Sequence, residues 1–152
     1  MPVAYIDLQP GLSTNARERL AKEVTAALHD AYQIPDTRIF LREWPVGTVS
    51  IDGVLGAPFR PICNFVVPPG LPSDAKRSLV KRVSRSIGEA CDLRQDVVPL
   101  PSGKAVSTHW VLAFFSEYPL DRAALDDLMA FENPMVTESM ETAIQVQAGR
   151  SQ

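Results

Sequence analysis

The first eight residues, Met1-Pro2-Val3-Ala4-Tyr5-Ile6-Asp7-Leu8, place a proline directly behind the initiator methionine and then run into a strand-like apolar segment. If Met1 is removed, Pro2 becomes a free secondary amine at the start of a β-strand. An α-amino group ordinarily titrates near pH ~8, and modest desolvation or a nearby cation lowers its pKa. A general base works best when its pKa lies near the working pH. Pro2 is therefore a candidate base; the alternative is that it only stiffens the start of the chain.

The composition is that of an ordinary globular protein. The chain has 152 residues, of which 45% are hydrophobic and 22% are charged, so one compact domain or two fused halves are expected. A net charge of -3 and a pI near 5.3 give no electrostatic reason to expect a nucleic acid or an anionic membrane as partner.

The sequence also lacks the patterns of several other protein classes. No apolar run approaches the ~18 residues of a membrane span, and no signal-peptide pattern opens the chain, so a cytoplasmic protein is expected. The two cysteines, Cys63 and Cys91, lack metal-ligand spacing and are expected to be reduced and buried. No phosphate loop, nucleophile elbow or metal-ligand cluster appears, so we expect no cofactor.

An internal repeat is the strongest pattern in the sequence. When the chain is shifted by 59 residues, nine positions between Pro2 and Ala31 coincide with identical residues between Pro61 and Ala90. They include Pro2 over Pro61 and the triplet Pro-Gly-Leu that follows each first strand. A repeat of this length indicates that one supersecondary unit occurs twice.

Each repeat is expected to fold as a strand, a Pro-Gly turn, a helix and a second strand. In both helices apolar residues recur at helical spacing, with Ser13 and Ser73 as expected N-caps. Parallel strands joined by a crossover helix then give one mostly parallel sheet with two helices on one face, an α/β fold. The expected organisation is a single domain, with repeat one at 2–53, repeat two at 61–119 and a C-terminal helix and tail at 120–152.

Three further segments lie outside the repeated strand and helix pattern. Gly47 and Gly53 bracket a small expected hairpin or edge strand, and Val97–Ser107 is an insertion relative to repeat one. A short helix is expected over Asp121–Phe131. The tail after Pro134 carries apolar residues at helical spacing.

The Met-Pro start, the duplicated β-α-β unit and the run Gly47-Thr48-Val49-Ser50-Ile51-Asp52-Gly53 together resemble the tautomerase superfamily, over roughly 2–119. Its members include 4-oxalocrotonate tautomerase, macrophage migration inhibitory factor and cis-3-chloroacrylic acid dehalogenase. The chain is similar to the long, fused type, which assembles as a trimer. The resemblance implies a homotrimer in which the amino-terminal proline moves a proton between carbon and oxygen of a small enol or 2-oxo carboxylic acid.

The resemblance also implies substrate-binding residues. Arg38 falls on the position of a substrate-binding arginine of the short tautomerases, whereas Leu12 and Val49 stand where that group has a second arginine and an aromatic residue. His29 falls on the substrate-binding histidine of the cis-dehalogenase. That enzyme's paired arginines have no counterpart here, and its water-activating glutamate falls at or beside Leu125.

The residues themselves leave alternatives open. Arg38 and Arg42 share one face of a strand, so they bind a substrate carboxylate, face solvent or meet a subunit boundary. His29 lies opposite the apolar stripe of its helix and faces solvent unless a trimer boundary or pocket rim covers it. We therefore expect a tautomerase using Pro2, with Arg38, Arg42 and His29 binding substrate. The alternatives are a cofactor-free hydratase, dehalogenase or decarboxylase using cationic Pro2, or a non-catalytic trimeric binding protein.

Overall fold

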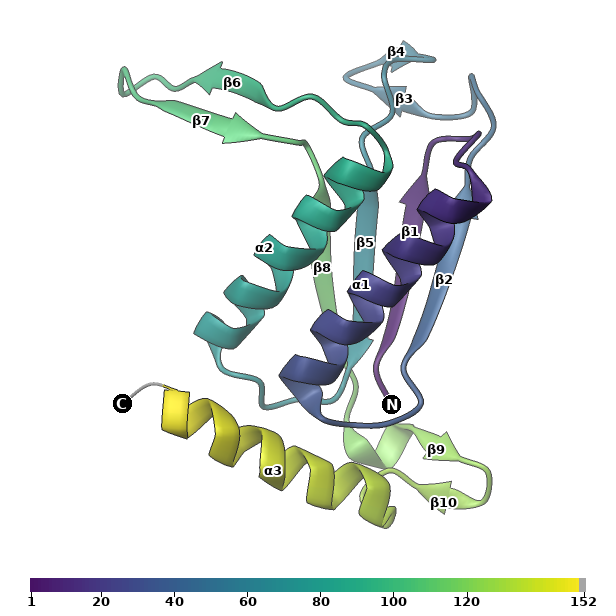
Figure 1. Ribbon diagram of the computed structural model, residues 1–152, viewed down its shortest axis with the longest axis vertical. Helices are drawn as coiled ribbons and strands as arrows, with labels where there is room; N and C mark the ends of the chain where they lie inside the picture. Colours follow the sequence, from purple (N-terminus) through teal and green to yellow (C-terminus); the bar gives the residue numbers. More distant parts are fainter. Residues whose placement is uncertain (151–152) are drawn as a thin grey trace.

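The computed structural model describes residues 1–150 and contains two β-α-β units that share one four-stranded sheet (Figure 1). The first unit is β1 (Val3–Leu8), α1 (Thr14–Tyr32) and β2 (Arg38–Glu43), and the second is β5 (Ile62–Val67), α2 (Ser73–Ala90) and β8 (Leu112–Glu117). The strand order is β2-β1-β5-β8. Pairing is parallel within each unit and antiparallel between β1 and β5. The predicted α/β fold with two tandem repeats is confirmed.

The antiparallel pairing in the centre places the two repeat prolines at opposite ends of the sheet. Val3 pairs with Val66 and Asp7 pairs with Ile62, so β1 and β5 begin at opposite edges. Pro2 and Pro61 immediately precede these strands. The structure therefore has two equivalent ends, which we call the Pro2 end and the Pro61 end.

Helices α1 and α2 lie side by side on one face of the sheet (Figure 1). The apolar stripes predicted from helical spacing form this layer, since Leu20, Val24 and Leu28 of α1 are buried, as are Leu79, Val83 and Ile87 of α2. They pack on alternate strand residues that are completely buried: Ala4, Ile6, Leu8, Cys63, Phe65 and Val67. Burying one large apolar side chain stabilises the fold by about 1.5–3 kcal/mol.

The two helices begin differently. The Ser13 side chain accepts a hydrogen bond from Ala16 N (3.1 Å), which confirms it as the N-cap of α1. The expectation for Ser73 was wrong: Ser73 is the first residue of α2, and Pro72 occupies the cap position without a side-chain hydrogen bond. Proline has fixed φ and is tolerated at a helix start, so the backbone at Pro72 rather than a hydroxyl sets the beginning of α2.

Two hairpins flank the Pro61 end. The small hairpin expected near Gly47–Gly53 consists of β3 (Ser50–Ile51) and β4 (Val54–Leu55). Its turn residues Asp52 and Gly53 both have positive φ (51° and 80°), as a two-residue type I′ turn requires. The insertion in repeat two forms the second hairpin, β6 (Asp96–Pro99) and β7 (Ala105–Thr108).

The expected helix over Asp121–Phe131 is wrong. The segment forms a short 3₁₀ helix, η1 (Leu120–Arg122), and a hairpin of β9 (Ala124–Leu125) and β10 (Leu128–Met129). Asp126, in the turn, adopts φ 54°. A helix interior excludes this left-handed conformation, whereas aspartate tolerates it in turns.

The expected polar tail, whose apolar residues recur at helical spacing, forms helix α3 (Pro134–Arg150), which lies across the Pro2 end of the molecule (Figure 1). Asn133, which is buried, accepts a hydrogen bond from Met135 N on its side-chain oxygen (3.0 Å). Pro134 follows as the first helical residue, where its missing N–H costs nothing. Val136 and Ala143 of this helix are buried within the protein. The last two residues of the expected tail lie outside the described residues. No helix within residues 1–150 has the length and apolar character of a membrane span.

The face of the sheet opposite the two helices is open and largely apolar at its centre. Its alternate strand residues include Tyr5, Phe40, Ile62, Leu112 and Phe114. Phe40 is 47% exposed and Phe114 is 51% exposed, while Tyr5 and Phe40 stack with ring centroids 5.0 Å apart. Exposed aromatic and aliphatic side chains gathered on one face, here interrupted by Asn64, are typical of an interaction face.

Candidate functional site at the Pro2 end

Met1 and Pro2 lie where the first strand of the sheet begins. The Pro2 side chain is completely buried, and its carbonyl oxygen accepts a hydrogen bond from Arg38 N (3.0 Å), which joins β1 to β2. Met1 is half-buried and packs against the apolar core. Because Met1 is joined to it, the Pro2 nitrogen is here a tertiary amide.

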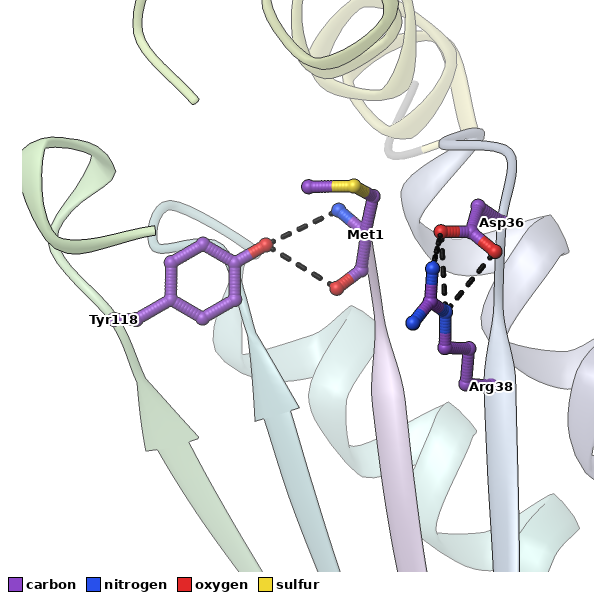
Figure 2. Close-up of polar contacts among 4 residues, drawn as sticks. All are labelled: Met1, Asp36, Arg38 and Tyr118. Atoms are coloured by element: carbon purple, nitrogen blue, oxygen red, sulfur yellow. Dashed lines mark hydrogen bonds and ion pairs between the residues drawn. The ribbon is translucent and has the colours of Figure 1, made fainter. Parts of the chain in front are cut away.

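The amino group of Met1 lies among polar side chains (Figure 2). It donates a hydrogen bond to the Tyr118 hydroxyl (3.1 Å), and the same hydroxyl donates to the Met1 carbonyl oxygen (3.3 Å). Figure 2 shows Tyr118 on one side of Met1 and the pair formed by Asp36 and Arg38 on the other. The site is thus built by β1, by the segment before β2 and by the end of β8.

Burial dominates the electrostatics of this amino group. Desolvation lowers the pKa of the Met1 amine from 8.0 to about 6, and the negative charge of Asp36 partly opposes that shift. Burial also raises the pKa of the Tyr118 hydroxyl to about 12, so it remains protonated at neutral pH. The position therefore favours a neutral amine beside a hydroxyl that can donate or accept a hydrogen bond.

Arg38 lies next to this amine but is paired. Its guanidinium donates from Nε and Nη2 to the carboxylate of Asp36, with the shortest contact at 2.7 Å. This hydrogen bond lowers the pKa of Asp36 and raises that of Arg38. The pair is exposed, and Asp36 adopts φ 59°. A carboxylate ligand that reached Arg38 would therefore compete with Asp36 for the guanidinium.

Arg42 lies elsewhere on the same strand face. It is four residues beyond Arg38, about 13 Å along a strand, and binds Asp7 at 2.8 Å. Trp44 Nε1 donates to the same carboxylate oxygen that Arg42 Nε contacts, Asp7 Oδ1 (2.8 Å), and Arg42 Nη2 donates to Asp7 Oδ2 (2.9 Å). Asp7 is 9% exposed, so Arg42 and Trp44 compensate a nearly buried charge. Within one chain the structure does not bring Arg42 to Pro2.

His29 is likewise not brought to Pro2. It is exposed on α1, where it lines a shallow depression with Lys22 and Thr25. Its backbone oxygen accepts a hydrogen bond from Gln33 N (2.8 Å) at the end of the helix. Of the four residues predicted for the site, the structure therefore places Pro2 and Arg38 together, and Arg42 and His29 apart from them.

Sequence reasoning missed two residues that contact or act on the amino end, Tyr118 and Asp36. The repeat contained a signal for Tyr118, because Ser116-Glu117-Tyr118-Pro119 matches Arg42-Glu43-Trp44-Pro45 at the strand ends. Tyr118 follows β8, which runs parallel to β5. Because β5 pairs antiparallel with β1, β8 ends at the edge of the sheet where β1 begins. This pairing had to be known before Tyr118 could be placed beside Met1. Asp36 had no sequence signal beyond its place before a strand.

The site contains no recognisable metal centre. Within residues 1–150 no group of three or more histidine, cysteine, aspartate or glutamate side chains could hold a metal ion. Both cysteines are free and buried, and burial raises the pKa of the Cys63 thiol to about 12 and of the Cys91 thiol to about 11. Such thiols remain protonated and unreactive at neutral pH.

Comparison with known proteins relates the chain to others by structure alone. No family model matches the sequence, and no curated protein matches it. Among solved structures, a symmetric trimer of wild-type fused 4-OT superposes with a TM-score of 0.69 at 16% identity, over 86% of this chain and 97% of that one. The structure of Pt0534 inactivated by 2-oxo-3-pentynoate has a TM-score of 0.61 at 19% identity, over 84% and 94%.

A macrophage migration inhibitory factor-like protein from Entamoeba histolytica has a TM-score of 0.62 at 14% identity, over 84% of this chain and 97% of that chain. These likenesses span nearly the full length of each solved chain, so both β-α-β units take part in them. The resemblance read from Pro2 and the internal repeat is thereby supported at the level of the fold. The chain has the fold of the fused 4-OT structures, with two β-α-β units in one chain.

Proposed function

We propose that this chain is a cofactor-independent tautomerase that interconverts the enol and keto forms of a small 2-oxo carboxylic acid. Pro2, freed by removal of Met1, is the general base and acid. The reaction needs no co-reactant, because the enol and keto forms are isomers. In the enol-to-keto direction Pro2 takes the proton of the enol oxygen, and the protonated amine delivers a proton to carbon as the carbonyl forms.

The environment of the amino group is the observation that carries this proposal. Burial lowers the pKa of the Met1 amine to about 6, and a Pro2 amine, one residue further in, would lie beside fully buried side-chain atoms. The same desolvation would keep Pro2 largely unprotonated near neutral pH. Removal of Met1 would also open the space that its side chain fills, directly in front of the new amine.

Arg38 is the residue that we propose to bind the substrate carboxylate. It lies beside Pro2, and its planar guanidinium suits bidentate contact with a carboxylate. The positive charge would also stabilise negative charge that develops on the enolate oxygen. Tyr118 is a second candidate for that role, because its protonated hydroxyl already lies 3.1 Å from the terminal amine.

We further propose a homotrimer in the cytoplasm. The fused 4-OT structures that superpose on this chain are trimers, and the open face of the sheet presents exposed Phe40, Leu112 and Phe114. In a trimer, Arg42 and His29 would serve as substrate ligands only for the Pro2 site of a neighbouring subunit, since neither reaches Pro2 in its own chain.

A non-catalytic binding protein is the second candidate, and retention of Met1 would favour it. With Met1 in place, Tyr118 holds both the amine and the carbonyl of that residue. The Pro2 nitrogen then has no basic lone pair. Intact-mass analysis separates the two candidates at once, because a chain that keeps Met1 cannot use Pro2 as a base.

The proposal is tested by covalent labelling with 2-oxo-3-pentynoate, the compound that inactivates Pt0534. A secondary amine adds to the activated alkyne: the N–C bond forms at the β-carbon and the amine proton ends on the neighbouring carbon. We expect one equivalent of label on Pro2 in peptide mapping, and loss of that label in Pro2→Ala under conditions of limiting reagent. A label found only on lysines, or equal labelling of both proteins, would contradict the proposal.

A further inference from the structure

The Pro61 end of the sheet contains a cavity of about 320 Å³. Its apolar wall is formed by Ile51, Pro58, Phe59 and Leu93, and its polar wall by Arg60, Arg94, Asp96, His109 and Trp110. The volume lies within the usual range of small-molecule sites, which combine apolar walls with a few charged groups. Nothing in the proposed tautomerase reaction uses this cavity.

This cavity is the internal counterpart of the Pro2 site. Arg60 precedes Pro61 as Met1 precedes Pro2, and Leu112 N donates to Pro61 O (3.0 Å) as Arg38 N donates to Pro2 O (3.0 Å). Trp110 lies two residues before Leu112, as Asp36 lies two residues before Arg38. Both residues adopt the same left-handed backbone, with φ 58° for Trp110 and 59° for Asp36.

The side chains at the two ends differ in a way that favours an anion at the Pro61 end. Where the Pro2 end has a titratable amine, the Pro61 end has the permanent charge of Arg60, whose guanidinium stacks on the Trp110 ring at 4.0 Å from the centroid. Where the Pro2 end has the carboxylate of Asp36, the Pro61 end has an indole. Stacking on an aromatic face fixes a guanidinium and leaves its edge free to donate hydrogen bonds.

The charges of the lining residues leave a net positive cavity. Asp96 is the lining carboxylate, and it accepts a hydrogen bond from Trp110 Nε1 (2.7 Å). Arg60 has only a loose contact with exposed Asp52, at 3.9 Å, and Arg94 makes no ion pair within residues 1–150. The lining thus contains two guanidinium groups and one carboxylate, and that carboxylate already accepts a hydrogen bond from Trp110.

We propose that this cavity is a second ligand site, which binds a small monocarboxylic acid with an apolar body and does not transform it. The carboxylate contacts Arg60 and Arg94, and the apolar body packs on Phe59 and Leu93. The site cannot perform proline chemistry, because Pro61 lies within the chain and its nitrogen is an amide. The proposal stands on the lining of the cavity and does not depend on the tautomerase activity.

Both tryptophans lie at the Pro61 end, but Trp110 lines the cavity and Trp44 does not, so their signals allow a residue-resolved test. Each indole donates a hydrogen bond to an aspartate: Trp110 to Asp96, and Trp44 to Asp7. The chain has two tryptophans, so a ¹H–¹⁵N spectrum of the full-length protein shows two indole signals, which Trp44→Phe assigns. During titration with phenylacetate we expect the Trp110 signal to shift and saturate, while the Trp44 signal moves little. The neutral analogue phenylacetamide is expected to leave both signals unchanged.

Variants then assign the contacts. Arg60→Gln and Arg94→Gln should each weaken phenylacetate binding by about tenfold, the effect of losing one charged hydrogen bond. Arg77→Gln is the matched control, because Arg77 is 79% exposed on α2 and outside the cavity; it should bind as the wild type does. Pro2→Ala should also bind normally, so loss of turnover and loss of this site are distinguishable.

Two outcomes would overturn the proposal. One is a Trp110 shift that is equal for phenylacetate, phenylacetamide and sulfate, which would mean that the cavity does not recognise a carboxylic acid. The other is unchanged binding in both arginine variants when their unfolding transitions remain cooperative, which would place the ligand elsewhere.

Discussion

The Pro2 end and the Pro61 end have the same backbone and different side chains. Each has a proline before a strand, a hydrogen bond from the partner strand to that proline's carbonyl, and a left-handed residue two positions before the partner strand. Even peripheral ion pairs correspond: Arg17 binds Glu43 in one unit, and Lys76 binds Glu117 in the other. The duplicated unit therefore repeats the same backbone arrangement at each end of the sheet.

Their chemistry differs because only one proline can become a chain end. At the Pro2 end, removal of Met1 would convert an amide into an amine near Tyr118, Asp36 and Arg38. At the Pro61 end, the preceding residue is Arg60, which supplies a permanent cation that stacks on Trp110. A duplicated fold can thus keep the geometry twice and place proton transfer at a single end. The predictions below test that asymmetry, from the largest expected effect to the smallest.

Blocking the terminus should have the largest effect. A form in which a non-removable glycine precedes Pro2 turns the proline nitrogen back into an amide, so turnover should fall by about 10²- to 10⁴-fold, the usual contribution of general acid–base catalysis. Steady-state rates, with intact mass to verify each terminus, provide the measurement. If the extended form kept the full rate, proton transfer would have to come from another group.

Substitution of Arg38 should have the next largest effect on turnover. Arg38→Gln removes the cation beside Pro2, and kcat/KM for a carboxylate substrate should fall by about ten- to a hundredfold, as expected for one charged contact. The neutral amide analogue of the substrate should be affected much less by the substitution. An equal loss for both substrates would show that Arg38 supports the structure and does not bind the carboxylate.

Arg42→Gln is the matched variant on the same strand face. It removes the cation paired with the nearly buried Asp7 and leaves the neutral hydrogen bond from Trp44, so the free energy of unfolding should decrease by about 1–3 kcal/mol. The fall in kcat/KM should be smaller than that of Arg38→Gln. Denaturant unfolding and steady-state kinetics on both variants make the comparison. A larger kinetic effect at Arg42 than at Arg38 would assign carboxylate binding to Arg42, across a subunit boundary.

The smallest predicted effect is a shift of the pH profile. The free Pro2 amine is the active base, so kcat/KM should rise with pH through a limb below pH 8, because burial lowers the pKa of an amine at this terminus. Asp36 raises the pKa of the Met1 amine, and the same charge should act on a Pro2 amine, so Asp36→Asn should move the limb downward by about half a unit to one unit. Asparagine also tolerates the left-handed backbone of this position. An upward shift of the limb in Asp36→Asn would contradict the inference that Asp36 raises the pKa of the amine.

Much of the fold could be predicted because the repeat and the periodicity are local properties. The two strands of each unit, the helical stripes and the Ser13 cap all follow from spacing of 2 or 3.6 residues and from turn chemistry. The segment 121–131 could not be predicted in this way, because a short apolar run fits a helix or a hairpin equally well. Its structure depends on Asp126 adopting positive φ and on packing at the Pro2 end.

The candidate site could be predicted only in part, for a related reason. Pro2 and Arg38 are each at the start of a strand, and parallel pairing brings such residues together. Tyr118 lies 117 residues after Met1 in the sequence, and it reaches Met1 because β1 and β5 pair antiparallel. The ion pair between Arg42 and Asp7 joins two neighbouring strands. The alternating pattern of either strand alone therefore could not predict it.

The most direct test of the central claim is ultraviolet-monitored ketonisation of phenylenolpyruvate and 2-hydroxymuconate by wild type, Pro2→Ala and Pro61→Ala, with Met1 confirmed absent by mass. We predict turnover by the wild type, loss of that turnover in Pro2→Ala, and near-normal rates in Pro61→Ala. Equal rates for the wild type and Pro2→Ala, or no turnover above the buffer background by wild type, would contradict proton transfer by Pro2 on such acids.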